Sequence, residues 1–208
     1  MSSALPTQIA LTGDLASAVP QAPLGQVPMS QVIISFAEDL IELPNFGAVE
    51  AFYQQDKIVA ILQQVLQYFE THQDTTEIPS QLGEFIFQKT VEVEIYVTEP
   101  VEARDINLDA RGKDYATNIL SYASELPEAV LELLPALPLG ELVICHAVVV
   151  SQAAEQDKTV EQHLTHLLVH GMLHLLGFDH ELGQAEQDEM EAIEIAVLDK
   201  LSVANPYE

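Results

Sequence analysis

The sequence has little cysteine, few basic residues and no long apolar run, and each shortage excludes a class of protein. Cys145 is its only cysteine, so the chain cannot form an intramolecular disulfide. No segment reaches the roughly 18 consecutive apolar residues of a transmembrane helix. No Lys or Arg precedes Lys57, so the positively charged start of a signal peptide is absent. We therefore expect a soluble cytoplasmic protein that does not bind membranes.

Basic residues are also few compared with acidic ones. Lys and Arg together number 7, Asp and Glu number 33, and the formal net charge is −26 at pH 7. Averaged over the surface, such a charge repels nucleic acid and anionic membranes. Arg104, Arg111 and Lys113 nevertheless fall close together in the sequence. The sequence therefore allows a local basic spot on an acidic body, although for Arg104 we favour an ordinary surface charge.

The length of 208 residues and an apolar content of 48% are typical of one domain with a real core. Residues 1–28 are rich in Ala, Pro, Ser, Gly and Gln and have no sustained periodicity, which predicts a disordered N-terminal extension. Residues 29–208 are then the single domain. Met29 is either the natural start of the protein or the first residue after a dispensable tail.

Hydrophobic periodicity predicts that short strands and amphipathic helices make up this domain. Strands are expected at 31–36, 91–98, 118–123 and 141–145, helices at 49–72, 102–109, 146–155, 160–176 and 185–201, and a proline-rich loop with a helical turn or two at 126–140. The last helix has an apolar face for packing and an acidic outer face that we expect to be solvated. This order predicts an α+β fold, a small mixed sheet of about four strands that helices cover mainly on one face.

The segment HGMLHLLGFDH, residues 170–180, carries the strongest chemical signal. His170 and His174 are one helical turn apart, so on a helix their rings project from the same face and can bind one ion. Gly177 can end that helix in a left-handed conformation, and the chain can then bring His180 back to the same ion. Three imidazoles with one open position describe a catalytic zinc site, so we expect one Zn²⁺ at these three histidines.

Two nearby side chains have weaker assignments. His166 lies four residues before His170 and offers a competing pair, but only the later set has Gly177 to close it. We expect His166 to lie beside the ligands or to face solvent. Asp179 is a candidate acceptor for the ring N–H of a ligand.

The histidine spacing matches the HExxHxxGxxH pattern of metzincin proteases at every position but one. The position of the protease glutamate, which activates the attacking water, is occupied by Gly171. This argues against an ordinary peptidase. A phosphodiester substrate relaxes the need for that base, because a metal and a cation can share the charge on the phosphorus oxygens.

Three blocks of sequence resemble the YbeY family of bacterial zinc-dependent endoribonucleases. They are RGKDYATNILSY at 111–122, LGELVIC at 139–145 and HLLVHGMLHLLGFDHE at 166–181. MSQVI at Met29 is similar to a family N-terminus, so the resemblance covers about residues 29–208. Glu141 stands where the family has an aspartate, which keeps the charge.

The resemblance implies a single-strand-specific endoribonuclease that acts in 3′-end maturation of 16S rRNA and in ribosome quality control. It implies that the partners are single-stranded RNA and the ribosome or its proteins, and not DNA. His170, His174 and His180 match the zinc ligands of the family, and Arg111 matches its functionally important arginine. A guanidinium is always charged and can bind a phosphate through two parallel hydrogen bonds, so Arg111 is our catalytic candidate.

Other residues of the first block are weaker candidates. Lys113 could lie near the mouth of the cleft, and Thr117, Asn118 and Ser121 could line it, although strand structure explains these three equally well. The attacking oxygen is either a water or the 2′-hydroxyl of the RNA.

Two other functions stay open. A zinc metalloprotease is favoured by the spacing and opposed by Gly171. A non-catalytic ribosome-assembly factor with a structural zinc is favoured by the low count of basic residues, because phosphate contacts drive RNA affinity.

Overall fold

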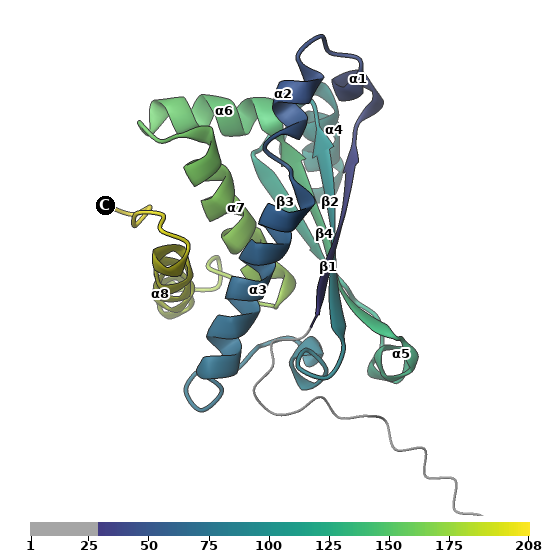
Figure 1. The fold of residues 1–208 in the computed structure, drawn as a ribbon, viewed down its shortest axis with the longest axis vertical. Helices are drawn as coiled ribbons and strands as arrows, with labels where there is room; N and C mark the ends of the chain where they lie inside the picture. Colours follow the sequence, from purple (N-terminus) through teal and green to yellow (C-terminus); the bar gives the residue numbers. More distant parts are fainter. Residues whose placement is uncertain (1–28) are drawn as a thin grey trace, which may run out of the picture.

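A four-stranded mixed sheet forms the centre of the molecule (Figure 1), in a computed structural model that describes residues 29–208. The strands are β1 (Ser30–Phe36), β2 (Thr90–Thr98), β3 (Ile119–Ala123) and β4 (Ala136–Cys145). Their order is β1-β2-β4-β3, with β3 antiparallel to β4 and the other pairs parallel. The predicted α+β class and four-stranded sheet are confirmed. The extension expected at 1–28 falls outside the described residues.

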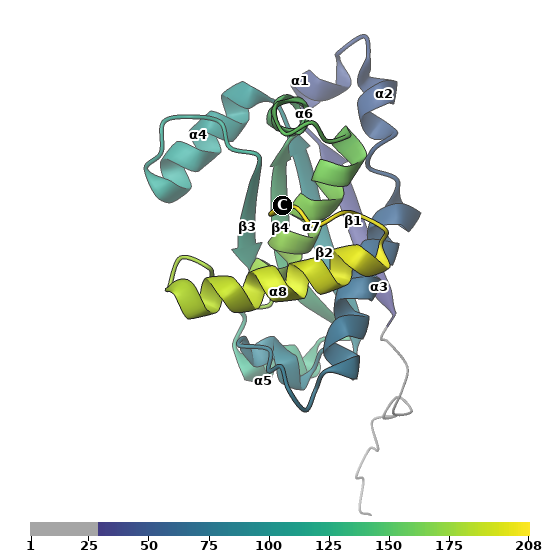
Figure 2. The same ribbon diagram turned by 90° about the vertical axis from the view of Figure 1, so that its left-hand side faces the viewer.

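The helices join the strands or follow the last of them. They are α1 (Glu38–Ile41), α2 (Phe46–Glu50), α3 (Gln55–Thr71), the 3₁₀ turn η1 (Gln81–Glu84), α4 (Pro100–Arg111), α5 (Glu128–Leu133), α6 (His146–Glu155), α7 (Val160–Leu175) and α8 (Gln184–Lys200). In Figure 1, α3, α6, α7 and α8 all lie on one side of the sheet. Figure 2 shows α8 crossing over α7 on that side. No helix of the described part is long and apolar enough to cross a membrane.

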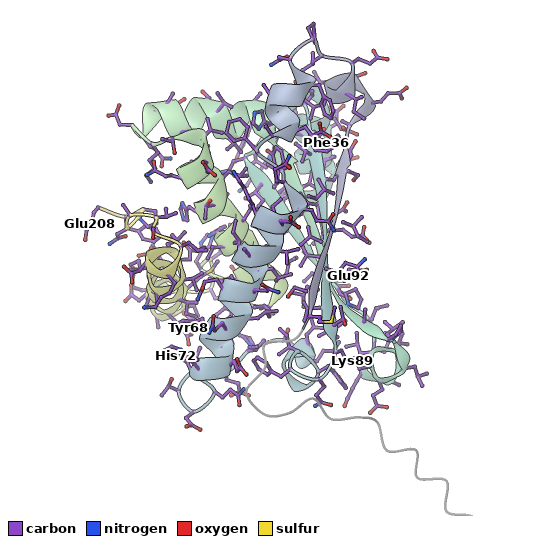
Figure 3. The ribbon with its side chains drawn as sticks, in the orientation of Figure 1. Phe36, Tyr68, His72, Lys89, Glu92 and Glu208 are labelled. Atoms are coloured by element: carbon purple, nitrogen blue, oxygen red, sulfur yellow. The ribbon has the colours of Figure 1, made fainter. Side chains whose placement is uncertain are left out.

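Strand β2 shows why the helices cover mainly one face of the sheet. Its sequence alternates between β-branched residues that are completely buried, such as Val93 and Val97, and polar residues that are not, such as Glu92 and Glu94. A period of two puts these sets on opposite faces. Glu92, labelled in Figure 3, lies on the face away from α3. The core therefore lies between the sheet and the layer that contains α3 and α7.

Two predicted boundaries were wrong. The helix expected over 49–72 is interrupted, because α2 ends at Glu50 and α3 begins at Gln55. Tyr53 occupies the break, where it is buried and its hydroxyl contacts His146 Nδ1 at 3.0 Å. The apolar spacing continues through this break, so periodicity alone could not show it.

The loop expected over 126–140 contains α5, but its last five residues belong to β4. The sequence predicted a loop here because the stretch contains prolines, among them Pro138. It lies where β4 pairs only with β2, because β3 pairs with the later residues Gly140–Ile144. A proline is tolerated where a strand has one neighbour instead of two.

Candidate metal centre

Helix α7 has a fixed start that sets the position of the histidines on it. Thr159 Oγ1 accepts the N–H of Gln162 (3.1 Å), and Gln162 Oε1 accepts the N–H of Thr159 (3.0 Å). This reciprocal capping box satisfies N–H groups that a helix start leaves unpaired. The helix then packs against β3 and α3, and it turns His170 and His174 toward the same cleft.

The end of α7 brings the third histidine back, as its glycine predicts. The N–H of Gly177 bonds to the carbonyl of His174 (3.0 Å), and the N–H of Phe178 bonds to that of Leu173 (3.1 Å). Gly177 has a φ of 95°. These two bonds and the positive φ are a Schellman ending, which reverses the chain direction. His180 is therefore returned to the helix face that carries the first two histidines.

The three histidines form a cluster that can hold one metal ion. One ring nitrogen from each of His170, His174 and His180 lies within 4.8 Å of the others. The ring centroids are 4.6 Å apart for His170 and His174, and 5.1–5.2 Å apart for the pairs with His180. All three side chains are half-buried, so the cluster is open to solvent on one side.

Hydrogen bonds show which ring nitrogens are free to bind the ion. His170 Nδ1 contacts Glu194 Oε1 at 2.8 Å, and His174 Nδ1 contacts the carbonyl oxygen of Phe178 at 2.9 Å. Both partners are acceptors, so each Nδ1 carries the proton. The two Nε2 atoms are then both lone-pair acceptors, yet they lie only 3.2 Å apart. Two lone pairs at this distance repel unless a cation neutralises them, so the donor set fits a metal that prefers imidazole, such as zinc.

The charges at the site favour the same protonation states. Burial and the neighbouring His170 and His180 lower the pKa of His174 to about 4, so this ring is neutral at pH 7. Burial raises the pKa of the Glu194 carboxyl, but hydrogen bonds from His166, His170 and Tyr207 outweigh it and lower the pKa to about 2. Neutral imidazoles are the form that binds metals.

The two weaker assignments near the motif have different outcomes. His166 lies beside the ligands and away from solvent: its Nε2 contacts Glu194 Oε2 at 3.0 Å, and its side chain is only 16% exposed. The assignment of Asp179 as an acceptor for a ring N–H was wrong. Its Oδ1 accepts the backbone N–H of Glu181 (2.9 Å), and the ring protons of His170 and His174 go to Glu194 and Phe178.

A cleft of about 390 Å³ joins the histidine cluster to residues from the first sequence block. It is lined by Arg111, Thr117, Asn118, Ser121, the three clustered histidines and neighbouring residues. Lys113 does not line it.

Arg111 ends α4 and is exposed, and within residues 29–208 it forms no ion pair. Arg104, in contrast, pairs with Asp105 and Asp114, as expected of a surface charge. Arg111 therefore places a positive charge without an ion-pair partner, among the described residues, in the cleft that holds the histidine cluster.

Gly171 lies where α7 packs against the sheet. A Cβ at this position would be 2.8 Å from Ile119 Cδ1 and 2.8 Å from Leu142 Cδ2. The position therefore points into the packed contact between α7 and β3, where a glutamate side chain has no room. The packing around position 171 therefore excludes the glutamate that acts as the base in a protease.

Glu194 and Tyr207 are site residues that the sequence analysis missed. The acidic face of the last helix was expected to be solvated, but the Glu194 side chain is only 1% exposed. The signal that could have found it is its spacing, because Glu194 follows Met190 by four residues and precedes Val197 by three, and both are buried. A carboxylate on the apolar stripe of a helix needs a partner, and here the partners are on α7.

Known proteins have sequences similar to this chain. The family model described as "Endoribonuclease YbeY" matches residues 50–202. An "Endoribonuclease YbeY" of Psychrobacter cryohalolentis is 63% identical over 120 residues, which are 58% of this chain and 77% of that protein. The one from Psychrobacter arcticus is 65% identical over 120 residues, 58% of each chain. The one from Acinetobacter baumannii is 50% identical over 122 residues, 59% of this chain and 77% of that protein.

Proposed function

This chain belongs to the YbeY endoribonuclease family, and we propose that it is a zinc-dependent enzyme that cleaves single-stranded RNA in the cytoplasm. The observation that carries the proposal is the shared cleft, in which Arg111 and the histidine cluster line one space. A phosphodiester needs two kinds of help during cleavage. Charge on the phosphorus oxygens must be stabilised, and an attacking oxygen must be placed in line.

The residues of the cleft can stabilise the charge on the phosphorus oxygens directly. Arg111 can bind two phosphate oxygens through its parallel N–H groups, and no described carboxylate competes for it. His170 and His174 direct their Nε2 lone pairs to one point, since each ring is held by a hydrogen bond at Nδ1. Zinc bound at that point would supply a Lewis acid with an open position. We therefore assign His170, His174 and His180 as its ligands and Arg111 as the phosphate-binding catalytic residue.

The biological substrate that we propose is ribosomal RNA, with a role in 3′-end maturation of 16S rRNA and in ribosome quality control. The support is the family resemblance. The net charge of −26 opposes encounter with free RNA, so a ribosomal partner would supply the missing attraction. Cells depleted of the protein should accumulate 16S rRNA with an extended 3′ end, and a catalytically inactive variant should not correct this. Normal 3′ ends in depleted cells would contradict this role.

The metalloprotease alternative is weakened by the packing around Gly171, which leaves no room for a catalytic glutamate there. The alternative of a non-catalytic assembly factor keeps one observation in its favour, the acidic composition. A metalloprotease would degrade casein. A non-catalytic assembly factor would bind ribosomes and leave RNA intact.

The test is a cleavage assay with the purified full chain. We expect cleavage of single-stranded RNA by the zinc-loaded protein, loss of cleavage after chelation, and recovery when zinc is restored. Duplex RNA and single-stranded DNA of the same sequence are the controls and should stay intact. A 2′,3′-cyclic phosphate on the product would identify the 2′-hydroxyl as the nucleophile, and a linear phosphate would identify water. Intact single-stranded RNA with zinc saturated would refute the proposed activity.

A further inference from the structure

Glu194 is a carboxylate enclosed between α7 and α8. Three groups contact its two oxygens: His170 Nδ1 lies 2.8 Å from Oε1, His166 Nε2 lies 3.0 Å from Oε2, and the Tyr207 hydroxyl also donates to Oε2. Its side chain is 1% exposed, so solvent contributes little to its solvation. A buried charge of this kind is costly unless hydrogen bonds compensate it, and here three do.

The two oxygens are used in different ways. Oε1 accepts a hydrogen bond from a single partner, the candidate ligand His170. Oε2 is held from two directions, by a histidine on α7 and by a tyrosine at the C-terminal end of the chain. We propose that Glu194 is a positioning residue of the metal centre and that His166 and Tyr207 hold its carboxylate in place for His170. This inference rests on the proposed function only in that the three histidines bind a metal.

The physical reason is that the carboxylate fixes both the tautomer and the direction of the His170 ring. An acceptor at Nδ1 keeps the proton there, which leaves the Nε2 lone pair free for the metal. A carboxylate acceptor also makes the ligand nitrogen more basic. His174 obtains the same orientation from the carbonyl of Phe178, a neutral acceptor. Glu194 is therefore the one formal negative charge that hydrogen-bonds to a clustered histidine in the part of the chain that the structure describes.

The C-terminal segment is folded so that it can reach this carboxylate. Val203 N donates to the carbonyl of Leu198 (2.9 Å), and Lys158 Nζ donates to that of Pro206 (3.2 Å). These bonds return the chain toward the start of α7, and Figure 3 shows Glu208 on the α8 side of the molecule. The Tyr207 ring packs edge-on against His166, with centroids 5.9 Å apart. Residues far apart in the sequence thus meet at one carboxylate.

A purely structural role would make a different prediction. If Glu194 only tied α8 to α7, its replacement would lower the stability of the protein with and without zinc by the same amount, and metal affinity would not change. The test therefore measures the zinc dissociation constant by competition with a chromogenic chelator, beside the melting temperature of the metal-free protein. Long-range ¹H–¹⁵N NMR spectra of the imidazoles report which nitrogen of His170 carries the proton.

Two variants of the full chain are compared with matched controls. Glu194→Gln keeps the shape and removes the charge, and its control is Glu189→Gln at an exposed position of the same helix. We expect zinc binding to weaken by about 10–100-fold and the His170 proton to lose its preference for Nδ1. Tyr207→Phe removes only the hydroxyl, and its control is Tyr115→Phe. We expect roughly a two- to tenfold loss of zinc affinity, the effect of one hydrogen bond.

Zinc affinity within twofold of wild type in both Glu194→Gln and Tyr207→Phe would overturn the inference, even if RNA cleavage is confirmed. If Glu194→Gln does not fold, Tyr207→Phe alone decides, because its side chain is 45% exposed and its loss leaves the core intact. A wild-type protein that binds no zinc would instead refute the proposed metal centre, and this inference with it.

Discussion

Ser80 lies directly against the turn that carries the chain from His174 to His180. Its backbone N–H donates to the carbonyl oxygen of Leu176 (3.2 Å), the residue before Gly177. A Cβ on Gly177 would lie 2.9 Å from that same Ser80 nitrogen. The loop before η1 therefore packs closely on the turn, and the turn must be a glycine for two reasons, its φ of 95° and this contact.

Gly177→Ala should consequently lower both the stability and the metal affinity of the protein. A non-glycine residue at such a φ costs about 1–3 kcal/mol, and relief of the contact with Ser80 would shift His180. Urea unfolding of the metal-free protein and zinc titration measure the two effects. Gly47→Ala is the matched control, because nothing lies within 4 Å of a Cβ there and its φ is not positive. Equal stabilities of the two variants would show that the turn does not need glycine.

His174→Ala should lose the metal and the activity together. Its Nε2 lies 3.2 Å from that of His170, so the variant removes one of the three imidazole nitrogens that would hold the ion. We expect less than one zinc per chain after dialysis and RNA cleavage at background, measured by elemental analysis and by gel assay. His72→Ala, at the exposed C-terminal end of α3, should retain both. Full zinc occupancy in His174→Ala would remove this residue from the ligand set.

Arg111→Ala should keep the metal and lose activity. Arg111 lines the cleft but is not one of the three clustered histidines that would hold the metal, so zinc content should stay at one per chain. Loss of one donor to the developing phosphate charge typically costs about 100-fold or more in rate. Lys113→Ala removes a neighbouring charge that does not line the cleft and should have a much smaller effect. Arg111→Lys should recover part of the rate, because it restores the charge without the paired donors. Wild-type rates in Arg111→Ala would exclude a phosphate contact by this residue.

The parts of the fold that could be predicted from the sequence are those set by local periodicity. The alternation in β2 and the apolar spacing of α6, α7 and α8 predicted these elements to within about two residues. Gly177 predicted the end of α7, because a left-handed ending is a local property of the chain. The cluster could be predicted for the same reason, since its three members lie within a segment of eleven residues.

The parts that could not be predicted depend on contacts between distant segments. The break at Tyr53 is fixed by a hydroxyl contact with His146, 93 residues later. Asp179 was expected to accept the ring N–H of a ligand, but the acceptor at His170 is Glu194, which lies 24 residues later in the sequence. Asp179 instead accepts the backbone N–H of Glu181, two residues later. A sequence shows that a ligand needs an acceptor, but tertiary packing decides which acceptor it has.

His163 makes the stability of the protein depend on pH. It is buried beside Gln152, whose Oε1 lies 3.2 Å from its Nε2. Burial, His166 and Lys158 lower the pKa of its ring from 6.5 to about 4. Well above pH 6.5 neither the folded nor the unfolded ring is protonated, so His163 does not affect stability there. As the pH falls from 6.5 to 4 the unfolded chain binds the proton first, so stability decreases.

Between pH 7 and pH 5 this should cost the wild-type protein about 2 kcal/mol of unfolding free energy. His163→Gln removes the titrating ring and should flatten the dependence by that amount, measured by urea unfolding at both pH values. The clustered histidines and the carboxylates are present in both proteins, so their contributions cancel in the comparison. An identical pH dependence in His163→Gln and wild type would mean that His163 is protonated as readily in the folded protein as in the unfolded chain.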